Sequence, residues 1–137
     1  MSNLIEQIKR HEGFSGQPYL DIEGYTTIGY GFNIDAGITR ALGEVILKHQ
    51  VEEIQKRVKD KYSWYTHLSS ARKDVIVNMI FNLGFVGFSQ FKRMIAAIES
   101  KDNIAVVNEM LDSKWAHQVK IRAWQLADQW RDDCYSP

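Results

Sequence analysis

The chain has 137 residues, 45% of them hydrophobic, which is enough for one domain with an adequate core. Its seventeen basic and seventeen acidic side chains cancel, and this balance argues against a nucleic-acid-binding protein. The lone Cys134 excludes an intramolecular disulfide, and the four scattered histidines lack metal-ligand spacing, so neither a metal nor a cofactor is predicted.

The first predicted element is an amphipathic helix that ends at Glu12. Leu4, Ile8 and Glu12 recur every fourth residue, so the carboxylate continues the stripe expected to face the core. Gly13 stands where helices commonly end. Burial and the negative end of the helix dipole both favour a neutral carboxyl group, which suits a general acid. The alternative is a structural carboxylate held by an arginine.

A glycine-rich hairpin is predicted next. Gly16 and Pro18 are expected to break the chain, residues 22–25 to form a tight turn, and residues 26–31 to form a β-rich segment. Asp21 precedes the turn, where an aspartate on its own is most often a turn-capping residue.

The segment after this turn has an unusual face. The two-residue period of a strand places Thr27, Gly29 and Gly31 together, leaving one hydroxyl on a surface nearly bare of side chains. Such a face lets a bulky polymer approach the backbone, although a glycine in a strand equally marks a bulge.

The remainder predicts a helical scaffold. Thr39 is the expected N-cap of a long helix through Lys59, with Leu47, Val51, Ile54 and Val58 on one face. Later helices are expected from Ser69 or Ser70 to Gly84, from Gly87 onward, after Asp102 or Asn103, and from about Val119 to Trp130.

Several short motifs occur together at a specific spacing. They are Glu12-Gly13, Tyr19-x-Asp21, Glu23-Gly24-Tyr25 and Thr27-Ile28-Gly29-x-Gly31, followed later by Asn78-Met79-x-Phe81-Asn82-x-Gly84 and Ser113-Lys114-Trp115. Over nearly the whole chain this pattern closely resembles the phage-type lysozymes, typified by the T-even bacteriophage enzyme. The resemblance implies a mostly α-helical α+β fold in one catalytic domain, residues 1–137. A small β-hairpin lobe (about 13–58) would be joined by a long helix to a helical lobe (about 59–137 plus the first helix), with a cleft between the lobes.

The resemblance also implies roles for individual residues. Glu12 matches the general acid of the family, and Asp21 and Thr27 match the pair that holds the attacking water in an inverting reaction. Arg122 matches an arginine that reaches the catalytic glutamate, and Asn33 and Phe81 match substrate contacts. By its apolar surroundings alone, Phe81 is more often a core residue.

Two features depart from the family pattern. Relatives commonly have a histidine where this chain has Phe32, so an ion pair in the small lobe is expected to be absent. The stretch after Asn33 is also shorter than in the T-even enzyme, which predicts a small lobe with fewer strands.

The predicted function is hydrolysis of the β-1,4 bond between N-acetylmuramic acid and N-acetylglucosamine in peptidoglycan. A retaining mechanism, a lytic transglycosylase and a non-catalytic glycan-binding or structural module remain alternatives, because the distance between the two carboxylates decides the stereochemistry. Residues 2–10 are charged and lack an apolar run, so no signal peptide is expected. A monomeric enzyme is expected, which accumulates in the host cytoplasm and reaches the wall through a separate holin, without inserting into a membrane itself.

Overall fold

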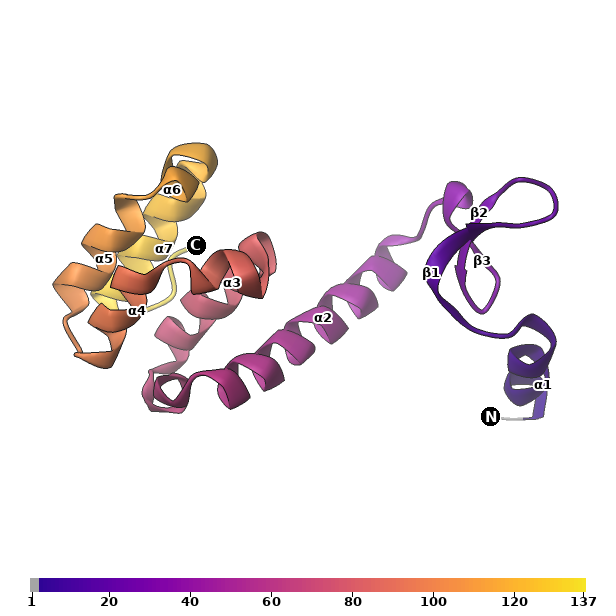
Figure 1. The fold of residues 1–137 in the computed structure, drawn as a ribbon, viewed down its shortest axis with the longest axis horizontal. Coiled ribbons are helices and arrows are strands. Elements are labelled where there is room, and N and C mark those ends of the chain that lie inside the picture. Colours follow the sequence, from indigo (N-terminus) through magenta and orange to yellow (C-terminus); the bar gives the residue numbers. More distant parts are fainter. Residues whose placement is uncertain (1–2) are drawn as a thin grey trace. The chain divides into compact units, whose positions relative to one another are not determined.

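The computed structural model describes residues 3–137, which form the helices and strands drawn in Figure 1. By their internal contacts they divide into two compact units, the first ending at Leu47 and the second running from Lys48 to Pro137, and each unit is described by itself. The predicted class is confirmed: a three-stranded antiparallel sheet is followed by a helical lobe, giving a mostly helical α+β protein. The predicted boundaries of the two lobes stay a prediction.

The first unit begins with α1 (Asn3–Glu12), which ends at Glu12 as predicted. Gly13 follows with a φ of 68°, and its N–H donates to the carbonyl of Lys9 at 2.9 Å. Within this unit α1 buries no side chain, and Leu4 and Ile8 are 61% and 42% exposed, so the expectation that the stripe faces a core stays a prediction.

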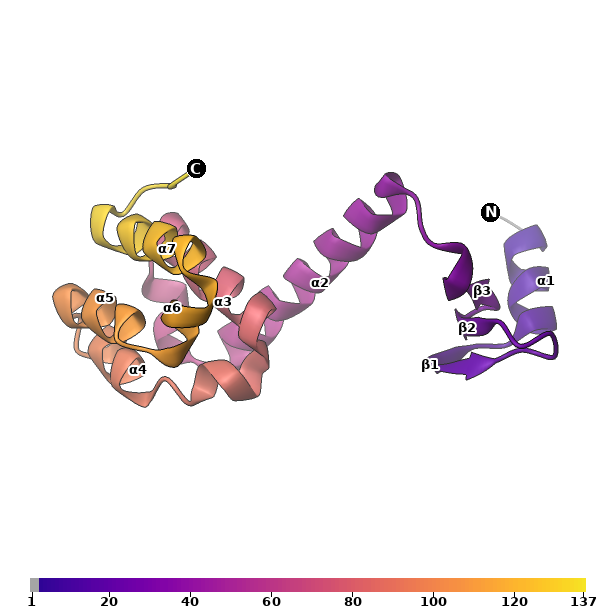
Figure 2. The same cartoon turned by 90° about the horizontal axis from the view of Figure 1, so that it is seen from above.

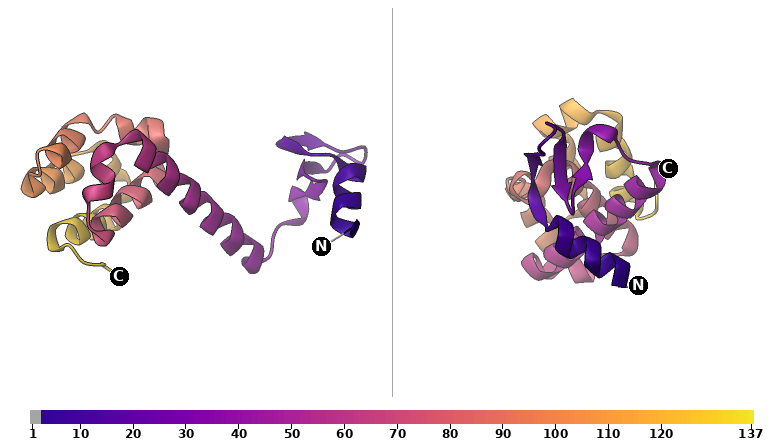
Figure 3. Two further views of the ribbon diagram at one scale, coloured as in Figure 1. Left: turned by 90° about the horizontal axis from the view of Figure 1, so that it is seen from below. Right: turned by 90° about the vertical axis from the view of Figure 1, so that its right-hand side faces the viewer.

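The sheet has the order β1-β2-β3, with β1 (Ser15–Leu20), β2 (Thr26–Gly29) and β3 (Phe32–Asn33). Figure 3 shows the three strands and α1 from two further sides. The predicted break at Gly16 and Pro18 is wrong. Both residues lie in β1, because an edge strand tolerates a proline with no N–H and the pairing register shifts between Ser15 and Tyr19.

The hairpin turn between Leu20 and Thr26 is confirmed, but the strand after it is shorter than predicted. It ends at Gly29, whose φ of 68° bends the chain out of the extended conformation, and Gly31 follows with a φ of 78°. Gly31 therefore lies in the β2–β3 turn and not on a strand face with Thr27.

A short 3-10 helix, η1 (Ile34–Ala36), follows the sheet, and α2 (Arg40–Lys61) then runs from the first unit into the second. The predicted N-cap is confirmed, since the N–H of Leu42 donates to Oγ1 of Thr39 at 3.1 Å. The predicted apolar face is confirmed in the second unit, where Val58 is fully buried and Val51 and Ile54 pack against the core.

The second unit continues with η2 (Ser63–His67), α3 (Ser70–Ser89), α4 (Lys92–Glu99), α5 (Asn103–Leu111), α6 (Lys114–Val119) and α7 (Ile121–Asp132). Figure 2 shows α4, α5 and α7 grouped around α3. These helices share one core, whose largest fully buried side chains are Trp130, Phe88, Ile76, Met79, Ile80, Met94 and Met110.

The caps of these helices agree only partly with the sequence. Ser69 caps α3 and Asp102 caps α5, each accepting a backbone N–H with its side chain, and Gly84 interrupts α3 with a φ of 76°. The predicted helix start at Gly87 is wrong, because α3 resumes after Gly84 and continues to Ser89.

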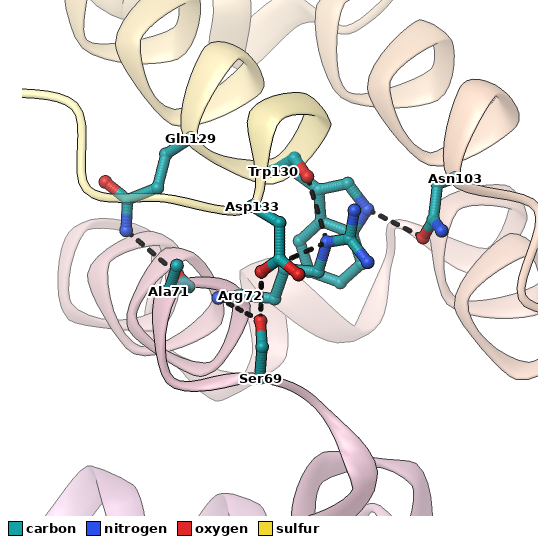
Figure 4. Close-up of polar contacts among 7 residues, drawn as sticks. All are labelled: Ser69, Ala71, Arg72, Asn103, Gln129, Trp130 and Asp133. Carbon is teal, nitrogen blue, oxygen red and sulfur yellow. Dashed lines mark hydrogen bonds and ion pairs between the residues drawn. The ribbon is translucent and has the colours of Figure 1, made fainter.

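Polar contacts join the start of α3 to the end of α7 (Figure 4). Nε of Arg72 donates to the carbonyl of Trp130 at 2.9 Å, and the side-chain amide of Gln129 donates to the carbonyl of Ala71 at 2.8 Å. Ser69 donates to the carboxylate of Asp133, which follows α7. These bonds fix α3 and α7 side by side in opposite directions.

Among the described residues, no single helix is both long and apolar enough to span a membrane. Taken together, α3 and α4 have the length and the apolar composition of a membrane span, but the pair is sharply bent. Both helices contribute side chains to the core described above.

Candidate active site

Glu12 lies at the junction between α1 and the sheet. Its carboxylate rests against the β2–β3 turn: a Cβ placed on Gly31 would lie 2.7 Å from Oε2 and 3.1 Å from the carboxyl carbon. Any residue other than glycine at this position would displace the carboxylate of Glu12. The fold thus sets Glu12 against bare backbone, and the carboxylate itself is exposed.

Asp21 is held rigidly by the hairpin turn. Its Oδ1 accepts the backbone N–H groups of Glu23 and Tyr25, each at 2.9 Å, and its own backbone bonds to Tyr25 and Gly24 close the turn. Asp21 therefore has the turn-capping role that its sequence setting favoured. Within residues 3–137 its second oxygen, Oδ2, accepts no hydrogen bond, so it is available to a proton donor.

Thr27 is the one polar side chain of the sheet that is buried, with 4% of its surface exposed. Its hydroxyl donates to the carbonyl of Tyr25 at 3.0 Å, and a hydroxyl that donates keeps two lone pairs with which to accept. Thr27 pairs directly with Asn33 across β2 and β3, so the exposed Asn33 side chain belongs to the same face.

The backbone of one residue, Tyr25, connects two of the predicted catalytic residues. Tyr25 donates its N–H to Asp21 and accepts the Thr27 hydroxyl, so the aspartate and the threonine are bonded to the same residue of the turn. No hydrogen bond or ion pair joins Glu12 to either of them in the described part of the chain. The first unit thus contains all three groups but links only Asp21 and Thr27.

Arg122 and Phe81 lie in the second unit. Nε and Nη2 of Arg122 donate to Oδ1 of Asn78 at 3.0 and 2.7 Å, and Nη2 also donates to the Asn78 carbonyl at 3.3 Å. Phe81 is 42% exposed and lines a shallow pocket with Ile54 of α2, so it is not the core residue that its apolar surroundings favoured. The proposed pairing of Arg122 with Glu12 stays a prediction.

Phe32, the predicted departure from the pattern, forms part of an aromatic group in the first unit. Its ring centroid lies 6.3 Å from that of Tyr30, which in turn lies 5.2 Å from that of Phe14. A Cβ on Gly29 would come within 2.8 Å of the Phe32 ring. An aromatic contact with glycine backbone thus occupies the position where the resemblance led us to expect a histidine.

Two residues of the site were not singled out from the sequence for the parts they play here. Gly31 makes room for the Glu12 carboxylate, and Asn78 holds the Arg122 guanidinium. The motif Thr27-Ile28-Gly29-x-Gly31 contained a signal for the role of Gly31. A glycine at its second position is explained better by the positive φ of a turn than by a strand face without side chains. No local pattern connects Asn78 to a residue 44 positions later. Among residues 3–137, no three His, Cys, Asp or Glu side chains are grouped so that they could bind a metal ion.

Comparison with known proteins decides the family. The model of the phage lysozyme family matches residues 9–127, which include Glu12, the whole hairpin and most of the helical unit. The chain belongs to the phage lysozyme family. It is therefore a glycoside hydrolase, and the family implies muramidase activity on peptidoglycan.

The relatives of this phage lysozyme family member occur in different settings. Probable T4-type lysozymes 1 and 2 of Dictyostelium discoideum are 26% and 28% identical to it, each with 90% of both chains covered. The pre-baseplate central spike protein Gp5 of Enterobacteria phage T4 is 24% identical over 88% of this chain, which corresponds to 26% of the spike protein. The matching region thus makes up most of the Dictyostelium proteins and about a quarter of the spike protein.

Proposed function

We propose that this protein hydrolyses the β-1,4 bond between N-acetylmuramic acid and N-acetylglucosamine in peptidoglycan, with inversion at the anomeric carbon. The observation that carries the proposal is the family match over residues 9–127, within which Glu12, Asp21 and Thr27 are all intact. The rigid turn that bonds Asp21 and Thr27 to one residue, Tyr25, supports a shared role for these two side chains.

In this mechanism Glu12 acts as the general acid. Its protonated carboxyl gives a proton to the glycosidic oxygen as the bond from that oxygen to the anomeric carbon breaks. The sugar that leaves therefore departs as an alcohol, and the remaining ring takes on oxocarbenium character. The position of Glu12 supports the role, because the missing side chain of Gly31 leaves the space that the carboxylate occupies.

Asp21 and Thr27 prepare the attacking water. Oδ2 of Asp21 accepts one proton of the water while the Thr27 hydroxyl oxygen accepts the other as a hydrogen bond. The water oxygen then attacks the anomeric carbon on the face opposite to the leaving group. The two backbone N–H groups bonded to Oδ1 fix the orientation of the carboxylate, so that Oδ2 stays available to the water.

The second unit supplies the proposed supporting residues. Arg122 supports Glu12 electrostatically, and its guanidinium is ordered for this by three hydrogen bonds to Asn78. Asn33, on the Thr27 face of the sheet, and the exposed Phe81 are proposed substrate contacts. These assignments rest on the resemblance of the motifs and on the side-chain environments described above.

A lysis assay tests the function directly. Clearing of permeabilised Gram-negative cells is measured for the unaltered chain, for Glu12→Gln and for Glu6→Gln, a matched exposed glutamate on the same helix. We expect loss of clearing in Glu12→Gln alone. Equal clearing by all three proteins would contradict the acid role, and no clearing by any of them would favour a non-catalytic glycan-binding module.

Product analysis tests the reaction type. Hydrolysis yields reducing muramic acid ends with the anomeric configuration inverted in the first-formed product, which mass spectrometry and rapid anomeric NMR detect. An anhydro-sugar would identify a lytic transglycosylase instead, and retained configuration would identify a covalent or substrate-assisted mechanism.

We further propose that the protein is a monomeric endolysin, which accumulates in the host cytoplasm and acts in the periplasm once a holin opens the membrane. The phage lysozyme family supports this context, although the Dictyostelium relatives show that the family is not confined to phages. Expression in a Gram-negative host with and without a holin tests it: lysis that depends on the holin supports the proposal, and lysis without one contradicts it.

A further inference from the structure

A second pocket of the helical unit lies at the start of α3. It encloses about 610 Å³ and is lined by residues of η2, α3, the α4–α5 turn and α7, among them Trp64, Leu68, Arg72, Glu99, Lys101 and Trp130. This volume falls within the usual range for small-ligand sites, which are mostly apolar and contain a few converging polar groups. None of its lining residues was assigned a role in the proposed reaction.

Arg72 is the best-defined polar group that lines this pocket. Its guanidinium carbon lies 5.5 Å from the centroid of the Trp130 ring, and its Nε donates to the Trp130 carbonyl at 2.9 Å and lies 3.8 Å from a carboxylate oxygen of Asp133 (Figure 4). The side chain is only 19% exposed. Within residues 3–137 its two terminal nitrogens donate to no protein acceptor. Arginine presents such nitrogens as a planar fork that matches a carboxylate.

The rim of the pocket carries both signs of charge. Glu99 ends α4 and Lys101 follows in the turn, and neither has an ion-pair partner in the described chain. Asp133 already faces Arg72, so the pocket has no large excess of positive charge. This balance disfavours a polyanion and favours a ligand with both a carboxylate and an ammonium group. The side chains of Trp64, Leu68 and Ile98 give it an apolar wall.

The pocket is distinct from the part of the helical unit proposed to contact the glycan. Arg72 and Trp130 meet at one end of the antiparallel α3–α7 pair, and Asn78 and Arg122 meet nearer the other. At a rise of about 1.5 Å per residue, Phe81 lies roughly 13 Å along α3 from Arg72. A ligand in this pocket would therefore not displace one at Arg122 or Phe81.

We propose that this pocket binds a short zwitterionic peptide, with a free carboxylate on the Arg72 fork and an ammonium group on Glu99. Alkyl parts of the peptide would lie on the apolar wall. Because this inference rests on the proposed function, we identify the ligand as the peptide of the bacterial wall, which carries carboxylates, a diamino acid and alanine methyl groups. The pocket would hold the enzyme on peptide-bearing wall independently of the bond that is cut.

Peptide binding can be measured without turnover. The free tetrapeptide L-Ala-γ-D-Glu-meso-diaminopimelate-D-Ala is titrated into the full chain, and the indole N–H signals of the four tryptophans are followed by NMR. We expect saturable shifts for Trp64 and Trp130, which line the pocket, and none for Trp115 and Trp124, which do not. Shifts spread over all four signals, or none at all, would overturn the proposal.

Variants locate the two charged contacts. Arg72→Gln and the exposed Glu99→Gln should each weaken binding about tenfold or more, the usual effect of losing a charge-assisted hydrogen bond. Lys92→Gln, an exposed cation that lines a different pocket, is the control and should bind normally. Arg72→Gln also removes a hydrogen bond to α7 and can unfold the protein. If Arg72→Gln is unfolded, binding by Glu99→Gln decides the test. Normal binding by Glu99→Gln would overturn the proposed arrangement.

Two further probes separate the possible ligands. A tetrapeptide with all its carboxylates amidated should not bind. Glycerol phosphate should bind poorly, and preferential binding of glycerol phosphate would replace the peptide by a phosphate-bearing ligand. Failure of peptide binding with lysis still dependent on Glu12 would overturn this inference alone, whereas peptide binding with lysis independent of Glu12 would overturn only the proposed function.

Discussion

Substitution of Gly31 by alanine should slow the enzyme although it replaces no catalytic residue. The backbone at Gly31 has a φ of 78°, and an L-residue pays roughly 1–2 kcal/mol in such a left-handed conformation. The new Cβ would lie 2.7 Å from Oε2 of Glu12, so the carboxylate must retreat by about 0.7 Å to reach the 3.4 Å of ordinary contact. A misplacement of about 1 Å can reduce turnover by 10²-fold, and we therefore expect a loss of roughly 10- to 100-fold.

Gly37 provides the matched control for this experiment. It has the same φ of 78°, but a Cβ there meets nothing within 4 Å. Its ψ of −173° is one that residues other than glycine rarely combine with such a φ, so Gly37→Ala should lose at least as much stability in urea unfolding as Gly31→Ala, while only Gly31→Ala loses activity in the cell-clearing assay. The flexible Glu12 side chain can move aside at small cost in stability, which is why the effect should appear in turnover. Full activity of Gly31→Ala, assayed at the same protein concentration as the unaltered chain, would refute the reasoning.

Four further predictions concern the helical unit. Asn78→Ala removes the three hydrogen bonds that order Arg122 and should lower turnover several-fold, but it should add little in an Arg122→Ala background; additive losses in the double-mutant cycle would contradict a shared role. Asn82→Ala removes the acceptor of the buried Trp115 Nε1–H, at 2.6 Å, and should cost about 1–3 kcal/mol of unfolding free energy in denaturant titrations; this cost should shrink in Trp115→Phe. Ile76→Ala, at a fully buried position, should lower the free energy of unfolding by about 2–5 kcal/mol in denaturant titrations, whereas Ile104→Ala, at a position that is 78% exposed, should lower it by about 0.5 kcal/mol or less. Equal losses would contradict the assignment of Ile76 to the core. Burial, and to a lesser extent the charge of Asp74, raises the pKa of Tyr65 above its usual value of 10.0. The stability that this proton contributes should therefore be present below about pH 10 and be lost as the pH rises through the higher pKa of the folded state. Urea unfolding at alkaline pH measures the loss, and an identical decline in Tyr65→Phe would contradict the prediction.

Local signals were enough to predict many of the helix ends. Thr39, Ser69 and Asp102 each cap the helix that the sequence assigned to them, since one side-chain oxygen and one backbone N–H determine a cap. Gly13 ends α1 for an equally local reason. These features depend on five consecutive residues at most, and the sequence contains all of them.

Features that depend on pairing were predicted less well. Pro18 suggested a break, but its place in an edge strand removed the need for its N–H. Gly31 suggested a strand face, but it belongs to a turn whose conformation is set by the pairing of Ile28 with Phe32. The pairing of partners far apart in sequence, such as Asn78 with Arg122, has no local signature at all.

The site itself was predicted mainly through its motifs. Glu12, Asp21 and Thr27 were identified by resemblance, and their chemistry as isolated residues left a turn cap or a structural carboxylate open. In the structure one oxygen of the Asp21 carboxylate caps the turn, as the sequence context indicated, and among the described residues the other oxygen accepts no hydrogen bond. A structural role and a catalytic role are therefore compatible at this residue.

The most direct test of the central claim is the rate at which purified sacculi release reducing ends. General acid catalysis contributes about 10²- to 10⁴-fold, so Glu12→Gln should release reducing ends more slowly by at least about 10²-fold, while Glu6→Gln retains the rate of the unaltered chain. A Glu12→Gln protein that is folded and cleaves within a few-fold of the unaltered rate would contradict the assignment of Glu12 as the acid.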